Sequence, residues 1–554
     1  MGIKEKFAYH SGLLLVLSLA VIFLFVNLGD IALWQDEAET ALLGRSILRN
    51  GIPKAWDGKN LISSLNGADF DKDFVWTWHP WAQAYLTALS FSIFGESNFS
   101  ARLPFALAGF FTIFFLYLSA LRITRDEKTA LLSSFLLTVS LQYILYSRQC
   151  RYYSLLGLFS VLIFYSCFRL PEKKGMMMLV FSSVLLFHSN FLPFFPTFFG
   201  VLIYLVIFER NTGKIKSFFL CAVIIGFLTA PWLIYAKGFS GGLRVLKEGK
   251  GVSFLGQEIE LLKIINENVF PLVFIPLAVY FLFKRNTAHK KVYQLLLILI
   301  FINLLFLPYI SYTQKIIGMR YSAGLIPFFS LLSALLIVDI LKYKRLLGYF
   351  VFIILISTNI FNDFPVFVLK GVSFAFGGFN REIILKSEIG KTIFFKKKYF
   401  DFIYELTHHY EGPVDGIVKF LGQRGKSGDL VLTNYESAPI IFYTTCKVAY
   451  VISNESEFYK SIPSKRYNPV LEEKLPDYVY SLKKVDWIIP RSNYINRLFN
   501  PAVVLGRMEK EGYNIKKYEL NYPDLPWNNR ADIRYHRFKT AKDYPKIAVY
   551  KIEK

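Results

Sequence analysis

The stretch "IALWQDEAETALLGRSILRNGIP", residues 31–53, follows directly on an apolar run at residues 11–29 that is long enough to cross a bilayer. It places three acids, Asp36, Glu37 and Glu39, close together where the chain leaves the membrane. Charged groups at such a position are either solvated by water and lipid headgroups or belong to a functional site. The course of the rest of the chain helps to decide between these two interpretations.

Composition indicates a polytopic α-helical membrane protein. Of the 554 residues, 54% are hydrophobic and 55 are phenylalanine, which is more than a single water-soluble core accommodates. The apolar stretches predict about eleven transmembrane helices. They lie near residues 11–29, 102–121, 129–147, 152–168, 176–190, 192–208, 217–236, 268–283, 292–310, 322–341 and 346–362.

The distribution of basic residues predicts the orientation. Residues 81–95, "WAQAYLTALSFSIFG", are short for a span and contain several polar residues. If they form an interfacial helix, the basic loops all fall on the side of the N-terminus, as the positive-inside rule requires. These loops lie near residues 122–128, 169–174, 210–216, 284–291 and 342–345. We therefore predict a cytoplasmic N-terminus, and the net charge of +23 needs no nucleic-acid partner to explain it.

The chain is predicted to divide into a transmembrane domain at residues 1–362, a connector at 363–410 and a small α/β domain at 411–554. In the last of these, residues 414–422 and 437–444 have helical spacing, and strands are predicted at 428–434, 447–453 and 485–492. This domain and the loop at residues 30–80 are expected on the outer face of the plasma membrane. Nucleotide-activated substrates are not available there in a prokaryote, so the membrane would have to deliver the substrate.

The acids of the opening stretch allow two interpretations. Residues 36–50 have helical spacing, and Gly51 and Pro53 are expected to end the helix. In the first interpretation Asp36 caps this helix, Glu39 completes a capping box, and the carboxylates face water. In the second, a partly buried carboxylate deprotonates an acceptor hydroxyl. The spacing alone favours the first, but the two are compatible.

Four stretches, taken in order, resemble the polyprenyl-phosphate-dependent glycosyltransferases of the GT-C fold. Within that superfamily the chain is most similar to protein O-mannosyltransferases, of glycosyltransferase family 39, and to the aminoarabinose transferase of lipid A. The similarity covers most of residues 11–341. The stretches are "LWQDEAETALLGRSILRNGIP" (33–53), "WTWHPWAQAYLTALSFSIFGESNFSARLP" (76–104), "YSRQCRYYSLLG" (146–157) and "GMRYSAGLIPFFSLLSALL" (318–336).

The resemblance implies both an activity and a catalytic base. The first outer loop of the family opens with an Asp-Glu pair, matched here by Asp36 and Glu37, and the Asp is regarded as the base. The implied enzyme is a hexosyl- or pentosyltransferase that takes a sugar from a polyprenyl-phosphate lipid. Its acceptor would be a hydroxyl of a protein, a lipid or a polysaccharide. One base and a cationic phosphate site suffice for an inverting single displacement.

Cationic side chains at outer span ends are the candidates for binding the donor phosphate. We predict this role for Arg151 and Arg320, and also for His79 and Arg148. The alternatives are arginines that extend toward headgroups and a histidine that bonds to backbone. Two positions depart from the family. Trp78 replaces an acid that helps to bind metal in the aminoarabinose transferase, and Ser154 replaces an acid that follows the arginine in O-mannosyltransferases.

A divalent cation is a further possibility. Asp69, Asp71 and Asp73 alternate in "NGADFDKDF", so a strand would place all three carboxylates on one face. Hard cations take such oxygen ligands. A solvated acidic loop is the alternative, and it is the one favoured by base rates, so no cofactor is firmly predicted.

Other residues are candidates for contacts with the acceptor or the sugar. Glu39 shares the helix of Asp36, and His188 lies at an outer span end. Trp527 and Asn529 belong to "NYPDLPWNNRADIRYHRF" (521–538), which resembles a C-terminal tail of bacterial members of the superfamily. For His188 and for this tail, a purely structural role is the alternative.

Two other classes of protein are considered. A transporter would carry ionisable or broken spans at mid-membrane in repeated halves, and the sequence has neither feature, apart from Asp339 near a cytoplasmic end. A non-catalytic lipid-binding or assembly protein of the same fold would not depend on Asp36. The sequence alone does not distinguish this last class from the enzyme.

Overall fold

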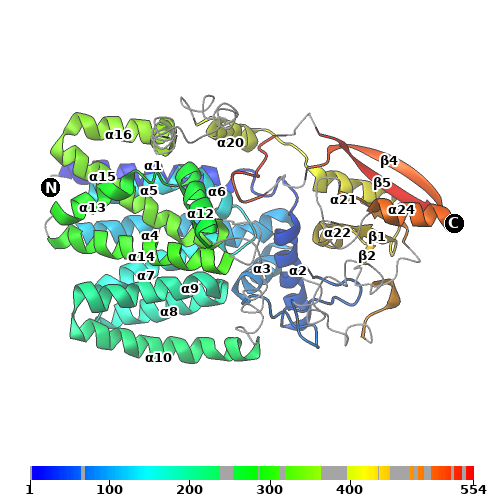
Figure 1. The fold of residues 1–554 in the computed structure, drawn as a ribbon, viewed down its shortest axis with the longest axis horizontal. Coiled ribbons are helices and arrows are strands. Elements are labelled where there is room, and N and C mark those ends of the chain that lie inside the picture. Colours follow the sequence, from blue (N-terminus) through cyan, green and yellow to red (C-terminus); the bar gives the residue numbers. More distant parts are fainter. Residues whose placement is uncertain are drawn as a thin grey trace.

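The computed structural model describes most of the chain. The described residues are 3–63, 69–236, 254–284, 287–311, 319–363, 396–434, 436–449, 474–479, 485–491, 501–525, 530–539 and 544–553. They form a long helical bundle with a small sheet-containing domain at one end (Figure 1). The predicted architecture, a bundle of apolar helices with a C-terminal α/β domain, is confirmed.

The predicted apolar stretches coincide with helices of the bundle, apart from their ends. Within the described residues, five helices are long and apolar enough to cross a membrane, and a sixth passes if α5 and α6, bent by 66°, count as one. Shorter apolar helices complete the bundle. The bundle consists of α1 (Ile3–Phe25), α4 (Asn98–Thr124), α5 (Glu127–Thr138), α6 (Leu141–Ser147), α7 (Tyr153–Arg169), α8 (Lys173–Ser189), α9 (Phe191–Ile203) with a π-helical turn (Tyr204–Glu209), α10 (Thr212–Tyr235), α12 (Phe254–Asn268), α13 (Phe274–Lys284), α14 (Thr287–Ser311), a 3-10 segment (Met319–Leu325), α15 (Ile326–Tyr343) and α16 (Arg345–Ser357).

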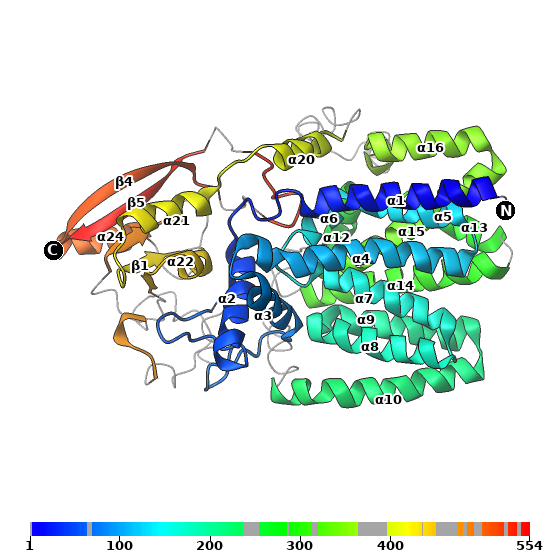
Figure 2. The same ribbon diagram turned by 180° about the vertical axis from the view of Figure 1, so that it is seen from behind.

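Two short helices lie at the end of the bundle that faces the C-terminal domain. Helix α2 (Gln35–Asn50) runs across the bundle axis, and α3 (Ala82–Phe94), the predicted interfacial helix, packs beside it (Figure 2). Gly51 ends α2 in the left-handed conformation with φ 74°, as expected for a glycine C-cap. The close packing depends on Gly44, where an added Cβ would lie 3.0 Å from Thr87 Cγ2 and 3.2 Å from the Ala88 nitrogen.

The basic loops gather at the opposite end of the bundle, beside the N-terminus (Figure 1). Ion pairs link some of them: Lys342 lies 3.2 Å from Asp126, and Lys214 and Lys291 both lie 2.9 Å from Glu209. The basic loops between the helices of the bundle therefore share one end, as the sequence predicts. The side of the membrane on which each end lies stays a prediction.

The C-terminal domain is built on a mixed sheet with strand order β2-β1-β3-β5-β4. Its first three strands are parallel, and β5 pairs antiparallel with β3 and β4. The two predicted helices correspond to α21 and α22, and the three predicted strands correspond to β1, β2 and β3. Strands β4 and β5 and helix α24 were not predicted. The elements are α21 (Pro413–Arg424), β1 (Leu430–Thr433), α22 (Ser437–Tyr443), β2 (Lys447–Val448), β3 (Trp487–Ile489), α24 (Pro501–Lys510), β4 (Asn514–Pro523) and β5 (Lys546–Glu553).

The predicted connector contains helix α20 (Lys397–Thr407), which lies between the bundle and the C-terminal domain (Figure 1). Residues 364–395 lie outside the described residues. The predicted domain boundaries stay predictions.

Replacing Gly44 should loosen the joint between α2 and α3. We expect Gly44→Val to lower the free energy of unfolding by about 1–3 kcal/mol, because the new methyl groups overlap Thr87 and the α3 backbone. Gly226→Val in α10 is the matched control, since nothing lies within 4 Å of a Cβ at that position. Thermal unfolding of the two variants in detergent tests this expectation, and equal stability would contradict it.

Candidate active site

Helix α2 begins without a side-chain cap. Its N-cap residue is Trp34, and the indole of Trp34 donates a hydrogen bond to Gln149 instead of capping the helix. The interpretation that Asp36 caps the helix is therefore wrong, as is the capping box with Glu39. The expectation that the carboxylates face water is also wrong for Glu37 and Glu39, which are 0% and 4% exposed.

Glu37 is closed off by Arg102 of α4. Arg102 donates two hydrogen bonds to the Glu37 carboxylate, at 2.8 and 2.7 Å, and the Cys150 backbone N–H donates a third at 2.7 Å. Arg102 also donates to the carbonyls of Leu28 and Ile31. With both oxygens bonded and no exposed surface, Glu37 positions its neighbours and does not reach a substrate, which argues against the catalytic role predicted for it.

Asp36 is the accessible acid of the group. Its side chain is 20% exposed, and its Oδ2 lies 3.5 Å from Arg151 Nη2 and 3.7 Å from Arg320 Nη1. These separations exceed the 2.7–3.2 Å of a formed N–H···O bond, so neither arginine is locked onto the carboxylate. The predicted base thus lies between the two arginines that were predicted to bind phosphate.

Asp36, Arg151 and Arg320 form a charged cluster; Glu39 adjoins it through Arg151, and His79 adjoins Glu39. Arg151 Nη1 lies 3.3 Å from Glu39 Oε1 and donates to Thr40 Oγ1 at 2.9 Å. His79 Nε2 lies 3.9 Å from the same Glu39 oxygen, and Gln83 of α3 contacts the His79 ring at 3.1 Å. The structure therefore brings His79 to Glu39 rather than to Asp36.

Charge keeps the Arg151 guanidinium protonated. Burial on its own lowers the pKa of Arg151, but the carboxylates of Asp36 and Glu39 outweigh this effect and raise that pKa above its ordinary value. A positive charge held in a site largely closed to water attracts an anion more strongly than it would in solvent.

Arg148 and His188 are not part of the cluster. Arg148 donates to the carbonyls of Phe23 and Val26 at 3.0 and 2.9 Å, so it caps the end of α1. His188 lies in the last turn of α8, where it bonds to the Leu228 backbone and its ring lies 5.3 Å from that of Phe187. The position of His188 fits the structural alternative considered for it, whereas Arg148 is buried against α1 and does not extend toward headgroups.

The three loop aspartates do not share one face. Residues 69–73 form a turn and not the strand that the metal hypothesis needs. Asp69 is buried and accepts from Ser63, Asp71 accepts from the Val75 backbone at 2.9 Å, and exposed Asp73 lies 3.6 Å from Lys474. Among the described residues, no group of three or more His, Cys, Asp or Glu side chains could hold a metal ion.

The C-terminal segment reaches the site from the far end of the sequence. Gln142 of α6 donates to the Ala531 carbonyl at 2.7 Å and accepts from the Ile533 N–H at 3.1 Å. The Arg530 guanidinium lies 4.1 Å from the centre of a Trp34 ring. Trp527 and Asn529, proposed from the sequence for this segment, lie outside the described residues.

Residues that support the site were missed by the sequence analysis. Arg102 stands near the outer end of a span, the same signal that singled out Arg151, but it was not weighed. Gln83 and Thr40 carry no comparable signal, because uncharged polar residues are common in helices at this depth. Their roles follow only from contacts between separate helices.

Replacing Arg102, the ion-pair partner of Glu37, should lower the stability of the protein. We expect Arg102→Gln to lower the free energy of unfolding by about 3–5 kcal/mol, because a carboxylate would be left buried without its cation. Lys517→Gln, which removes an exposed ion pair with Glu519, is the control and should change little. Unfolding in detergent by a chemical denaturant measures both, and comparable stabilities would contradict the structural role of Arg102.

Comparisons with known proteins find one family model and several solved structures that resemble this chain. Residues 78–235 match the family model described as dolichyl-phosphate-mannose-protein mannosyltransferase. ArnT from Cupriavidus metallidurans, solved bound to undecaprenyl phosphate, superposes with a TM-score of 0.56 at 12% identity over 97% of each chain. Its apo state gives a TM-score of 0.55 at 12% identity over 98% of each chain.

A curated relative matches a shorter part of the chain. An uncharacterized protein of Aquifex aeolicus is 30% identical over 138 residues, which are 24% of this chain and 25% of that protein. The match thus spans about a quarter of the relative's length. The resemblance to polyprenyl-phosphate-dependent glycosyltransferases of the GT-C fold is confirmed, as a family match over residues 78–235 and as a shared fold over nearly the whole chain.

Proposed function

We propose that this protein is a membrane glycosyltransferase that moves a sugar from a polyprenyl phosphate to an acceptor hydroxyl, with Asp36 as the base. The observation that carries the proposal is the environment of Asp36. It is the most exposed of three neighbouring acids, and two arginines flank it at 3.5 and 3.7 Å. The names of the matched family and of ArnT support a lipid-phosphate sugar donor.

The reaction is an inverting single displacement. The acceptor oxygen attacks the anomeric carbon as its proton passes to an Asp36 carboxylate oxygen, and the bond from that carbon to the phosphate oxygen breaks. The electron pair leaves with the polyprenyl phosphate, whose negative charge grows as the bond breaks. Deprotonation by a positioned base contributes roughly 10²–10⁴-fold to such a rate.

Arg151 and Arg320 are suited to hold the leaving phosphate. Guanidinium groups bind phosphate oxygens through paired N–H donors. Arg151 is fixed by Glu39 and Thr40, while Arg320 is 34% exposed and stacks on Tyr321 at 5.0 Å. Arg151 is thus held in place by polar contacts, and Arg320 is the more exposed of the two, with 34% against 9% of its side chain accessible.

The orientation belongs to the same proposal. Five basic loops lie at the end of the bundle opposite to Asp36, so the positive-inside rule places Asp36 and the C-terminal domain outside the cytoplasm of the cell. A donor carried by a lipid reaches this face without a nucleotide. The acceptor would be a protein, a lipid or a polysaccharide that carries a hydroxyl.

Asp36→Asn should abolish transfer while the protein still folds and binds donor. We expect turnover to fall by roughly 10²–10⁴-fold, because the amide cannot take the proton. The assay uses purified protein in detergent, radiolabelled polyprenyl-phosphate mannose, glucose and pentose donors, and membrane extract as acceptor. Asp73→Asn, which changes an exposed acid of the same outer loop, is the matched control. Near-normal turnover by Asp36→Asn would refute the mechanism.

The two arginines should differ from Arg148 in donor binding. Arg151→Gln and Arg320→Gln are each expected to weaken binding of the polyprenyl-phosphate sugar by roughly tenfold or more, through loss of charge-assisted hydrogen bonds. Arg148→Gln should leave donor affinity nearly unchanged, since Arg148 bonds to the end of α1. Equal affinities for all three variants, measured by equilibrium binding of labelled donor, would remove Arg151 and Arg320 from the phosphate site.

A further inference from the structure

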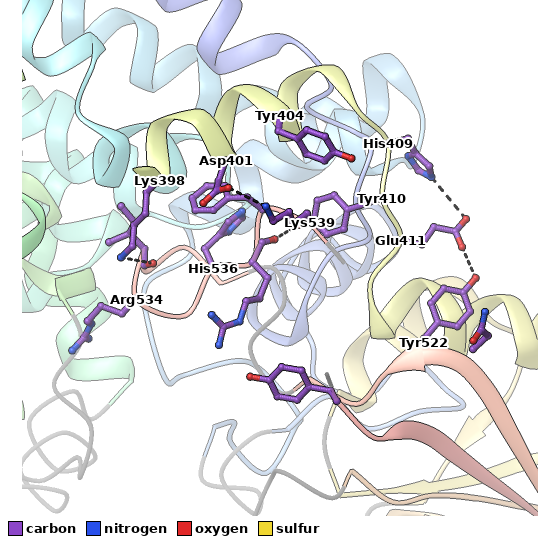
Figure 3. A pocket seen from close by; sticks show the side chains of 15 residues that line it. Lys398, Asp401, Tyr404, His409, Tyr410, Glu411, Tyr522, Arg534, His536 and Lys539 are labelled. Atoms are coloured by element: carbon purple, nitrogen blue, oxygen red, sulfur yellow. Dashed lines mark hydrogen bonds and ion pairs between the residues drawn. The ribbon is translucent and has the colours of Figure 1, made fainter. Parts of the chain in front are cut away.

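A cavity of about 1250 Å³ lies between α20, the segment at residues 530–539 and the end of β4 (Figure 3). Its lining contains neither Asp36 nor Arg151 nor Arg320. The cavity is therefore separate from the proposed catalytic site and large enough for a lipid headgroup or a saccharide.

The lining of this cavity carries an excess of positive charge. Its cations are Lys398, Arg534, Arg537 and Lys539, and its acids are Asp401 and Glu411. Both acids are already engaged. Asp401 lies 3.3 Å from Lys539, and Glu411 is bonded to Lys419 and accepts from Tyr522 (Figure 3).

Two of the cations form no direct ion pair within the described part of the chain. Arg534 is paired with Asp532 at 2.7 Å, but no described carboxylate lies at ion-pair distance from Lys398 or Arg537. Lys398 donates to the Ile533 carbonyl at 3.4 Å, and Asp532 and Glu267 attract it only from a longer distance. Two cations without a direct carboxylate partner at one cavity favour an anionic ligand, and phosphate oxygens are suited to both side chains.

Aromatic side chains form much of the remaining wall. Tyr404, Tyr522 and Tyr544 are partly exposed, whereas Tyr410 and Phe538 are buried behind them. Tyrosine offers an apolar ring and a polar tip, which suits a group that is polar at one end and apolar at the other. The lining thus favours a phosphorylated, amphipathic ligand over a free inorganic ion.

Helix α20 places the cavity at the membrane surface. Its buried side carries Phe402, which packs edge-on against Phe23 near the end of α1 at a centroid distance of 5.7 Å. Lys396 donates to the Leu355 carbonyl at the end of α16. The opposite side exposes Phe400, Ile403 and Tyr404, as an interfacial helix does when its apolar face enters the headgroup region.

We infer that this cavity binds the anionic, phosphate-bearing headgroup of a lipid from the adjoining leaflet, with the phosphate held by Lys398 and Arg537. Phe400 and Ile403 on the exposed side of α20 would lie among the acyl chains, and Tyr404, Tyr522 and Tyr544 at the cavity would contact the remainder of the headgroup. This inference is independent of the proposed transfer reaction and stands if no transfer is found.

The test compares the full-length protein with the double variant Lys398→Gln/Arg537→Gln. Native mass spectrometry of protein purified in detergent counts bound phosphatidic acid across a titration, with phosphatidylcholine as the comparison lipid. The charge-matched control is Lys510→Gln/Lys516→Gln, which changes α24 and β4 at the far end of the molecule (Figure 1). Thermal unfolding verifies that all three proteins are folded.

We expect the wild type and the control to retain phosphatidic acid at least roughly tenfold more tightly than the double variant, with little difference for phosphatidylcholine. A second arm measures the shift in melting temperature on adding inorganic phosphate alone. Equal retention of phosphatidic acid by all three proteins would overturn the inference. A shift with inorganic phosphate that the double variant loses, together with equal lipid retention, would instead identify free phosphate as the ligand and refute the lipid assignment.

Discussion

The buried ion pair between Glu37 and Arg102 is the constraint on which the site-bearing end of the molecule depends. Arg102 binds both oxygens of Glu37 and also the carbonyls of Leu28 and Ile31, so one guanidinium joins α4 to the end of α1 and to the first turn of α2. Because an unpaired charge in this environment would cost several kcal/mol, alternative placements of α2 are strongly disfavoured. The position of Asp36, the preceding residue, follows from this pair.

Helical geometry then gives the neighbouring acids different environments. Successive side chains on a helix turn by about 100°, so Glu37 points away from Asp36, whereas residues three and four apart, here Glu39 and Thr40, share the face of Asp36. Arg151 accordingly contacts both Asp36 and Thr40. Glu37 is closed by hydrogen bonds at 2.7–2.8 Å, while Asp36 keeps longer ion pairs and some exposure. A single short stretch thus supplies both a rigid anchor and an accessible carboxylate.

The helices of the bundle were predictable because each one is a long apolar stretch. A helix surrounded by lipid or by other helices needs apolar side chains along its whole length. It predicted α2 but not its start. Local capping preferences favour Asp36, yet the Trp34 indole bonds to Gln149 and fixes the first turn differently. Strand β5, "KIAVYKIE", alternates between buried and more exposed residues and could have been predicted from that period. The alternating aspartates at residues 69–73 implied a strand with three carboxylates on one face, but the backbone turns there and separates them.

The candidate site was only partly predictable, because its supports come from distant parts of the chain. The break between α5 and α6 turns the chain by 66°, and α6 then carries Gln142 at one end while Gln149 follows the other. Gln142 bonds to the backbone at Ala531, whereas Gln149 accepts from Trp34, which in turn lies under Arg530. No local pattern links residues so far apart in sequence. Charged residues at span ends could be recognised one by one from the sequence. The uncharged amides of Gln142 and Gln149, which connect the C-terminal segment and the first turn of α2 to α6, can be identified only from the packed helices.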